Sequence, residues 1–88
     1  MLQTVTASGF NRDWDGVYEY QYQEDHWKNG DYWIYRDSWY WYIANSGYQY
    51  IGEHNVAKLA VTSVNNTPIL DPRGSYTGTN GEPNGSVS

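Results

Sequence analysis

The histidines and their acidic neighbours are the residues of this sequence that could bind a metal ion. The chain has two histidines, His26 and His54, with Glu24, Asp25 and Glu53 beside them in sequence. A metal site needs a full set of ligands in a fixed geometry. Each histidine instead stands in a polar stretch whose acids are typical of a solvated loop or strand end. We therefore expect no metal ion and no cofactor.

Acidic residues could also act in pairs, as they do in glycoside hydrolysis. The candidate pairs are Asp13 with Asp15, Glu24 with Asp25, and Asp31 with Asp37. That chemistry requires two carboxylates about 5–10 Å apart across a cleft, and a chain of 88 residues offers little depth for one. Aspartate is also common at turns, where its side chain bonds the nearby backbone. Without a nucleophile elbow or a phosphate-binding glycine loop, the sequence predicts a protein that is not an enzyme.

Aromatic residues are the better candidates for function. The chain has five Trp, ten Tyr and one Phe, and all but Tyr76 lie between Phe10 and Tyr50. Large, rigid aromatic side chains with a polar edge are enriched where proteins meet their partners. The composition therefore points to binding, provided that some of these rings are not needed for the core.

Period-two alternation predicts the strands that carry these rings. Over residues 17–23, Tyr18, Tyr20 and Tyr22 alternate with Glu and Gln, which predicts a half-buried strand with its tyrosines towards the core. Asn29-Gly30 predicts a tight type I′ hairpin turn. Strands are then expected over residues 32–36, 39–43 and 48–51, joined by turns at residues 37–38 and 44–47.

Pairing these strands places aromatic residues on both faces of one sheet. A turn at residues 37–38 sets Arg36 opposite Trp39 and Ile34 opposite Trp41. One face then carries Tyr32, Ile34, Trp39, Trp41, Ile43, Tyr48 and Tyr50, and the other carries Trp33, Tyr35, Tyr40, Tyr42 and Ile51. Since an antiparallel sheet usually leaves one face to water, the second face needs a cover from the chain or from another molecule.

The predicted binding residues are therefore those of the second face together with the one late aromatic residue: Trp33, Tyr35, Tyr40, Tyr42 and Tyr76. Two ligands suit such a surface. One is a protein, with the rings at the centre of an interface, and the other is a carbohydrate whose sugar rings stack on the aromatic rings. Simple core packing is the alternative for part of the set.

The rest of the chain is less aromatic. An aliphatic run at residues 55–64 is expected to form a strand, and a lead-in strand is expected within residues 1–12. From residue 75 onwards the chain is rich in Gly, Asn and Ser and cannot bury itself. We therefore predict an all-β, sandwich-like or barrel-like meander over residues 1–70, followed by an extended polar arm over residues 71–88.

Charge and hydropathy exclude several partners. The formal charge is −5, which makes binding to a phosphate backbone unfavourable. No window approaches the ~20 apolar residues that cross a bilayer, and no signal peptide is visible. We expect neither nucleic acid nor membrane as a partner. A small domain without cysteine often gains stability by oligomerisation, so a homo-oligomer is expected.

Four segments together resemble a known class of module. They are Asp15-Gly16-Val17-Tyr18, Tyr32-Trp33-Ile34-Tyr35, Trp39-Tyr40-Trp41-Tyr42-Ile43 and Pro72-Arg73-Gly74-Ser75-Tyr76-Thr77-Gly78. Their order is similar to that in small β modules of bacteriophage virion proteins, found in tail fibres and in accessory capsid proteins. The resemblance implies a structural role with no catalytic residues. A tail fibre is normally long and repetitive, whereas this short sequence without repeats fits a capsid decoration protein better.

We therefore expect a non-enzymatic virion accessory protein, made in the host cytoplasm and bound to the major capsid protein or another virion protein. A carbohydrate-binding module that uses the exposed Trp and Tyr residues is the alternative.

Overall fold

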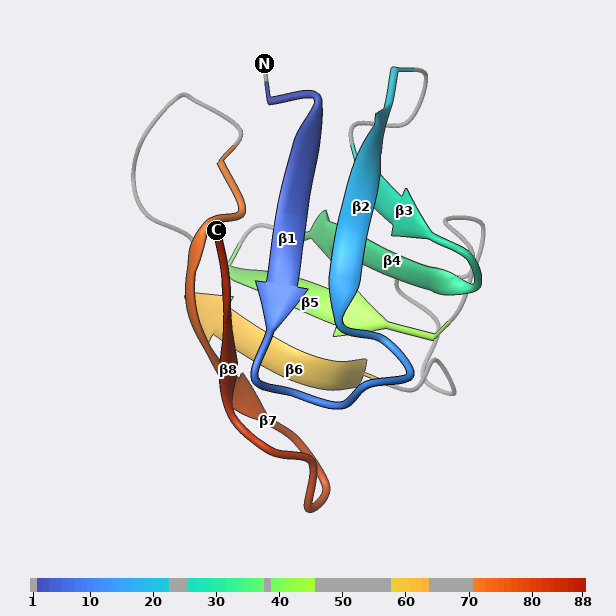
Figure 1. The fold of residues 1–88 in the computed structure, drawn as a ribbon. Coiled ribbons are helices and arrows are strands. Elements are labelled where there is room, and N and C mark those ends of the chain that lie inside the picture. The colour runs from blue at the N-terminus through green and yellow to red at the C-terminus, as the bar shows by residue number, and fades with distance from the viewer. Residues whose placement is uncertain (1, 23–25, 38, 46–57, 64–70) are drawn as a thin grey trace.

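The computed structural model describes residues 2–22, 26–37, 39–45, 58–63 and 71–88. Within them, antiparallel strands form a closed barrel in which each strand pairs with the next and the last pairs with the first (Figure 1). The strands are β1 (Thr4–Ser8), β2 (Gly16–Gln21), β3 (His26–Asn29), β4 (Tyr32–Arg36), β5 (Tyr40–Ala44), β6 (Lys58–Ser63), β7 (Gly74–Gly78) and β8 (Gly85–Val87). The all-β, barrel-like fold predicted from the sequence is thus confirmed.

Alternation along the strands fills the barrel interior. On β2, Tyr18 is fully buried and Tyr20 packs against the core, while Glu19 between them is exposed, as the sequence predicts. Tyr22 lies beyond the end of β2 and is 72% exposed; its predicted place on the core face is wrong. The interior cluster contains Val5, Ala7, Phe10, Trp14, Tyr18, Trp27, Ile34, Trp41, Ile43, Ala60, Tyr76 and Val87.

The interior is therefore largely aromatic. The rings of Phe10 and Trp14 stack with their centroids 4.6 Å apart, and those of Trp27 and Trp41 tilt against each other at 5.9 Å. Fully burying one such side chain contributes about 1.5–3 kcal/mol. These rings give a small barrel a core that its aliphatic side chains alone could not fill.

The hairpin of β4 and β5 keeps the predicted faces but has a different register. Ile34 pairs with Ile43 and Arg36 with Trp41, whereas a turn at residues 37–38 would set Ile34 opposite Trp41. The Asp37 N–H donates to the Tyr40 carbonyl, so the turn lies one residue later than predicted. Because the pairing shifts by an even step, each side chain stays on its face.

The turn between β3 and β4 also differs by one position. Asn29 pairs with Tyr32, so Gly30 and Asp31 form the two-residue loop in place of Asn29 and Gly30. Gly30 has φ +60°, a conformation that glycine adopts without a steric penalty. Asp31 does not have a positive φ, and a positive φ at the first loop residue alone is typical of type II′, whereas the predicted type I′ needs it at both.

Two further predictions concern the aliphatic run and the segment before it. The strand expected within residues 55–64 is confirmed where the structure describes it, as β6. The predicted strand over residues 48–51 and His54 lie outside the described residues.

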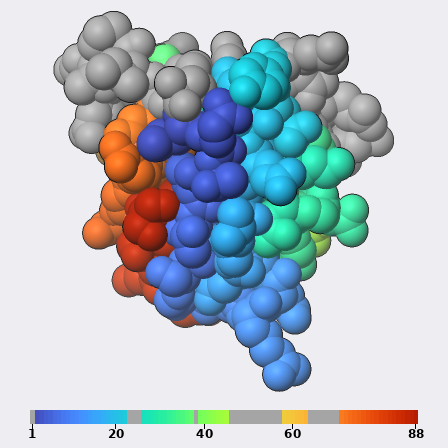
Figure 2. Space-filling model, turned by 45° about the horizontal axis from the view of Figure 1, so that its top comes forward, coloured from blue at the N-terminus to red at the C-terminus, as the bar shows by residue number. Residues whose placement is uncertain are grey.

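The extended arm predicted over residues 71–88 is instead part of the barrel. β7 pairs with β6 and β8, and β8 pairs with β1. Backbone hydrogen bonds of 2.8 and 2.9 Å join Thr6 and Ser88 in both directions, and Figure 2 shows the C-terminal atoms lying against those of β1. Tyr76 and Val87, 2% and 3% exposed, give this polar segment the apolar contacts that its composition did not suggest.

Candidate binding surface

Trp33, Tyr35, Tyr40 and Tyr42 form what we call the outer aromatic surface. They alternate along β4 and β5 with Ile34, Trp41 and Ile43, which point into the interior. Tyr35 and Tyr42 are cross-strand partners with ring centroids 5.5 Å apart, and the Tyr40 ring lies 6.1 Å from that of Tyr42. Trp33 packs against the same cluster. The structure thus brings together four of the five predicted binding residues.

Exposure divides these four residues. Tyr40 is 42% exposed, Trp33 and Tyr42 are half-buried, and Tyr35 is only 2% exposed. Tyr35 therefore packs against its neighbours, and its own ring is not accessible to a partner. The open part of the outer aromatic surface consists of Trp33, Tyr40 and Tyr42.

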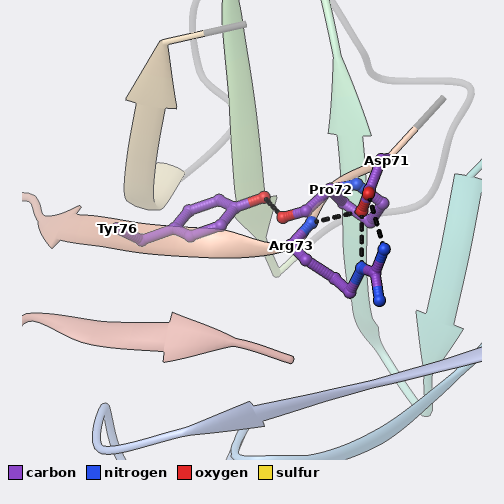
Figure 3. A network of polar contacts seen from close by, with 4 residues as sticks. All are labelled: Asp71, Pro72, Arg73 and Tyr76. Carbon is purple, nitrogen blue, oxygen red and sulfur yellow. Dashed lines mark hydrogen bonds and ion pairs between the residues drawn. The ribbon is translucent and has the colours of Figure 1, made fainter. Parts of the chain in front are cut away.

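Tyr76, the fifth predicted binding residue, lies in the barrel interior and not on this surface. Its ring meets Phe10 edge-on at 6.2 Å, and its hydroxyl donates to the Pro72 carbonyl oxygen at 2.6 Å. Beside it, the Arg73 guanidinium and backbone N–H bind the Asp71 carboxylate (Figure 3). Tyr76 thus holds the start of β7 in place, and its burial does not fit an interface residue.

Two lysines lie over the rings of this surface. Lys28 Nζ is 4.9 Å from the centroid of Trp33, and Lys58 Nζ is 4.8 Å from that of Tyr42. An ammonium group over an aromatic face is attracted by about 0.5–1 kcal/mol at an exposed site. The chain has only five basic residues, and two of them stand here, so this part of an acidic protein is locally less negative.

Asp37 organises the turn at the other end of the surface. Its Oδ1 accepts the backbone N–H groups of Trp39 and Tyr40, each at 2.8 Å, and its Oδ2 accepts the Tyr42 hydroxyl at 2.8 Å. Burial works to raise the pKa of Asp37. The N–H groups of Trp39 and Tyr40, the Tyr42 hydroxyl and the Lys58 charge outweigh it and hold this pKa below its ordinary value of 3.8. The carboxylate is therefore fixed in place and charged at neutral pH.

The tyrosine hydroxyls near Asp37 remain protonated. Burial, followed by the negative charge of Asp37, raises the pKa of Tyr35 to about 12. Burial, the hydrogen bond to Asp37 and its charge raise that of Tyr42 to about 12 as well. The Tyr42 hydroxyl donates to Asp37, and both phenol groups are neutral at pH 7. The surface thus presents aromatic rings, one carboxylate and two ammonium groups.

Trp39 is a surface residue that the sequence analysis missed. It was predicted on the face of Ile34 and Trp41, but it stands in the β4–β5 turn and is 72% exposed. The missed signal is Asp37 two positions earlier, because an aspartate that bonds the backbone two residues on marks a turn. This signal assigns Trp39 to the turn instead of the strand.

Of the acids considered for catalysis and metal binding, Asp13, Asp15, Asp31 and Asp37 lie within the described part of the chain. Asp15 Oδ1 accepts the Phe10 backbone N–H at 3.1 Å, which is a structural role. Among the residues that the structure describes, no three His, Asp or Glu side chains are grouped to hold a metal ion. Glu24, Asp25, Glu53 and His54 lie outside the described residues.

Within the described ranges, the structure contains no helix long and apolar enough to cross a membrane.

Comparison with known proteins gives no relative: no family model matches the chain, and no curated protein or solved structure is significantly similar to it.

Proposed function

We propose that this barrel is a non-enzymatic virion accessory protein, of the kind that decorates a bacteriophage capsid, and that it is made in the host cytoplasm. The observation that carries the proposal is the outer aromatic surface. The interior cluster is already filled by its own aromatic residues, from Phe10 to Tyr76. The rings on the outside of β4 and β5 are additional to that core and are left partly open.

A protein partner suits the end of this surface where Trp33 and Tyr42 lie. Both rings are half-buried, and Lys28 and Lys58 lie over them. Interfaces combine such aromatic centres with a polar rim. The partner proposed here is the major capsid protein or another virion protein, and copies of the chain would assemble as a homo-oligomer on it.

The C-terminal segment is part of the closed barrel, which changes how the chain would attach to a virion protein. An extended arm over residues 71–88 would have been a second means of attachment, but β7 and β8 are built into the barrel. The proposal therefore rests on a sheet surface and not on a flexible tail. This makes it testable by substitutions that leave the fold intact.

Co-sedimentation tests the proposal. The purified chain is mixed with purified phage particles that lack it and is centrifuged through a density gradient. We expect the wild type to travel with the particles, and Lys28→Glu and Trp33→Ala to reduce the bound fraction at least tenfold. Tyr22→Ala removes an exposed ring from a different part of the barrel and serves as the matched control.

Thermal melting of each variant separates lost binding from lost folding, and Lys28→Glu is an exposed change that leaves the core untouched. Failure of the wild type to bind particles would overturn the virion role. Equal binding by wild type and Lys28→Glu, together with a folded Trp33→Ala that binds normally, would show that this surface is not the interface.

A further inference from the structure

The β4–β5 turn presents a group of exposed side chains at the end of the outer aromatic surface that lies away from Trp33. Trp39 is 72% and Tyr40 42% exposed, and they are neighbours in the chain. Exposed aromatic rings lose the hydrophobic stabilisation that burial would give them. Two consecutive ones at a turn therefore suggest a ligand that covers them.

Asp37 gives this group a fixed polar partner. Its carboxylate is held from three sides, by the N–H groups of Trp39 and Tyr40 and by the Tyr42 hydroxyl. A carboxylate oxygen accepts about two hydrogen bonds. Among the described residues, Oδ2 accepts one, from Tyr42. The exposed Asp37 thus offers an oriented acceptor position in the same turn as Trp39 and Tyr40.

The chemistry of this arrangement selects the ligand. The face of an aromatic ring is electron-rich and favours contact with weakly positive C–H groups, which the apolar face of a sugar ring provides. An acceptor beside that ring orients the ligand through its hydroxyl groups. The charged Asp37 and the net charge of −5 disfavour an anionic ligand. What fits is therefore a neutral, hydroxyl-rich ring.

We infer that the β4–β5 turn is a binding subsite for a neutral carbohydrate, with Trp39 and Tyr40 stacking on the sugar and Asp37 accepting hydrogen bonds from its hydroxyl groups. The subsite shares only Tyr40 with the Trp33, Tyr35, Tyr40 and Tyr42 face for which a carbohydrate was considered from the sequence, and it adds Trp39 and Asp37 of the turn. The inference does not depend on the virion role, because it concerns the isolated chain.

The test uses NMR titration of the purified chain with neutral hexasaccharides built from glucose, mannose, galactose or N-acetylglucosamine, and with polygalacturonate as the anionic probe. We expect at least one neutral hexasaccharide to shift the Trp39 indole signal in a saturable way. Trp39→Ala should weaken that binding at least tenfold.

Asp37→Asn is the sharper variant. The amide oxygen can still accept the turn N–H groups, while the acceptor at Oδ2 is replaced by a donor. We expect at least tenfold weaker binding with the fold retained. Tyr22→Ala, which removes an equally exposed ring elsewhere, should bind like the wild type.

Three results would overturn the inference. They are no saturable binding by any neutral hexasaccharide, stronger binding of polygalacturonate, and an affinity that is unchanged in both Trp39→Ala and Asp37→Asn. An equal loss in Tyr22→Ala would count as the same refutation, since it would indicate unspecific adhesion to exposed rings.

Discussion

Three tyrosines of this barrel are almost equally buried, but their hydroxyl groups differ. In the interior, Tyr18 donates to the Trp14 carbonyl at 2.5 Å and Tyr76 to the Pro72 carbonyl at 2.6 Å. On the outer aromatic surface, the hydroxyl of Tyr35 has no hydrogen-bond partner among the described residues. A buried hydroxyl without a partner costs about 1–3 kcal/mol. The two interior tyrosines avoid this cost, whereas Tyr35 on the outer aromatic surface does not.

The two interior tyrosines belong to similar corners. Each stands two residues after a glycine that begins a strand, Gly16 with φ +135° and Gly74 with φ +149°. Each bonds a carbonyl four residues earlier. The corners at the starts of β2 and β7 are therefore fixed by local contacts, which do not depend on any partner molecule.

The largest expected effect comes from removing an interior ring. Tyr76→Ala should lower the free energy of unfolding by about 3–5 kcal/mol, as for other aromatic residues deleted from a core. Tyr40→Ala, on the outer surface, should cost less than about 1 kcal/mol. Urea denaturation measures both, and equal losses would contradict the distinction between interior and outer surface.

The next effect concerns the space inside the barrel at β8. A Cβ on Gly85 would lie 2.7 Å from the Phe10 ring and 2.5 Å from the Ser8 carbonyl oxygen. Gly85→Ala should therefore destabilise the barrel by about 3 kcal/mol through overpacking. Gly81→Ala, with φ +84° but open space around it, should cost only about 1 kcal/mol. A tolerated Gly85→Ala in chemical denaturation would show that the interior is less tightly packed than described.

Removing one hydroxyl group at a time tests whether the interior and outer tyrosines differ in their contribution to stability. Tyr18→Phe leaves the buried Trp14 carbonyl without its donor and should cost about 1–2 kcal/mol. Tyr35→Phe removes a hydroxyl that has no described partner and should leave the free energy of unfolding unchanged or slightly higher. If melting curves show the same loss of unfolding free energy in Tyr18→Phe and Tyr35→Phe, the Tyr35 hydroxyl must have a hydrogen-bond partner.

The smallest effect is the response of the outer surface to acid. The folded-state pKa of Asp37 lies below its ordinary value of 3.8, so its stabilising contribution is present above that value and is lost as the pH falls through the folded-state pKa. Stability should therefore decline as the pH falls through 3.8 and below, and less steeply in Asp37→Asn than in the wild type. Identical slopes in denaturation at several pH values would exclude this contribution.

Local patterns in the sequence predicted much of the sheet. Alternation identified β2, β4 and β5 and assigned Ile34 and Ile43 to one face and Tyr35 and Tyr42 to the other. These assignments survive the altered register because side-chain direction has a period of two. The register itself depends on the side-chain bonds that Asp37 makes to the backbone, which alternation does not record.

The closure of the barrel could not be predicted in this way. The segment of β7 and β8 is polar, and its stability comes from pairing with β1 at the far end of the sequence. Tyr76 was therefore interpreted as an exposed binding residue when it is a core residue. The binding surface was only partly predicted, because the roles of Trp39 and Asp37 can be recognised only when the position of the β4–β5 turn is known.

The pairing of β1 with β8 also sets the order in which this protein can fold. The other pairings of the described sheet join strands that are consecutive in the chain, so these contacts close smaller loops at a lower cost in chain entropy. The bonds between Thr6 and Ser88 join segments far apart in the sequence and must wait until Ser88 has left the ribosome. Until β8 has been made, the sheet is therefore an open ribbon with two unpaired edges, which are exposed to wrong pairing.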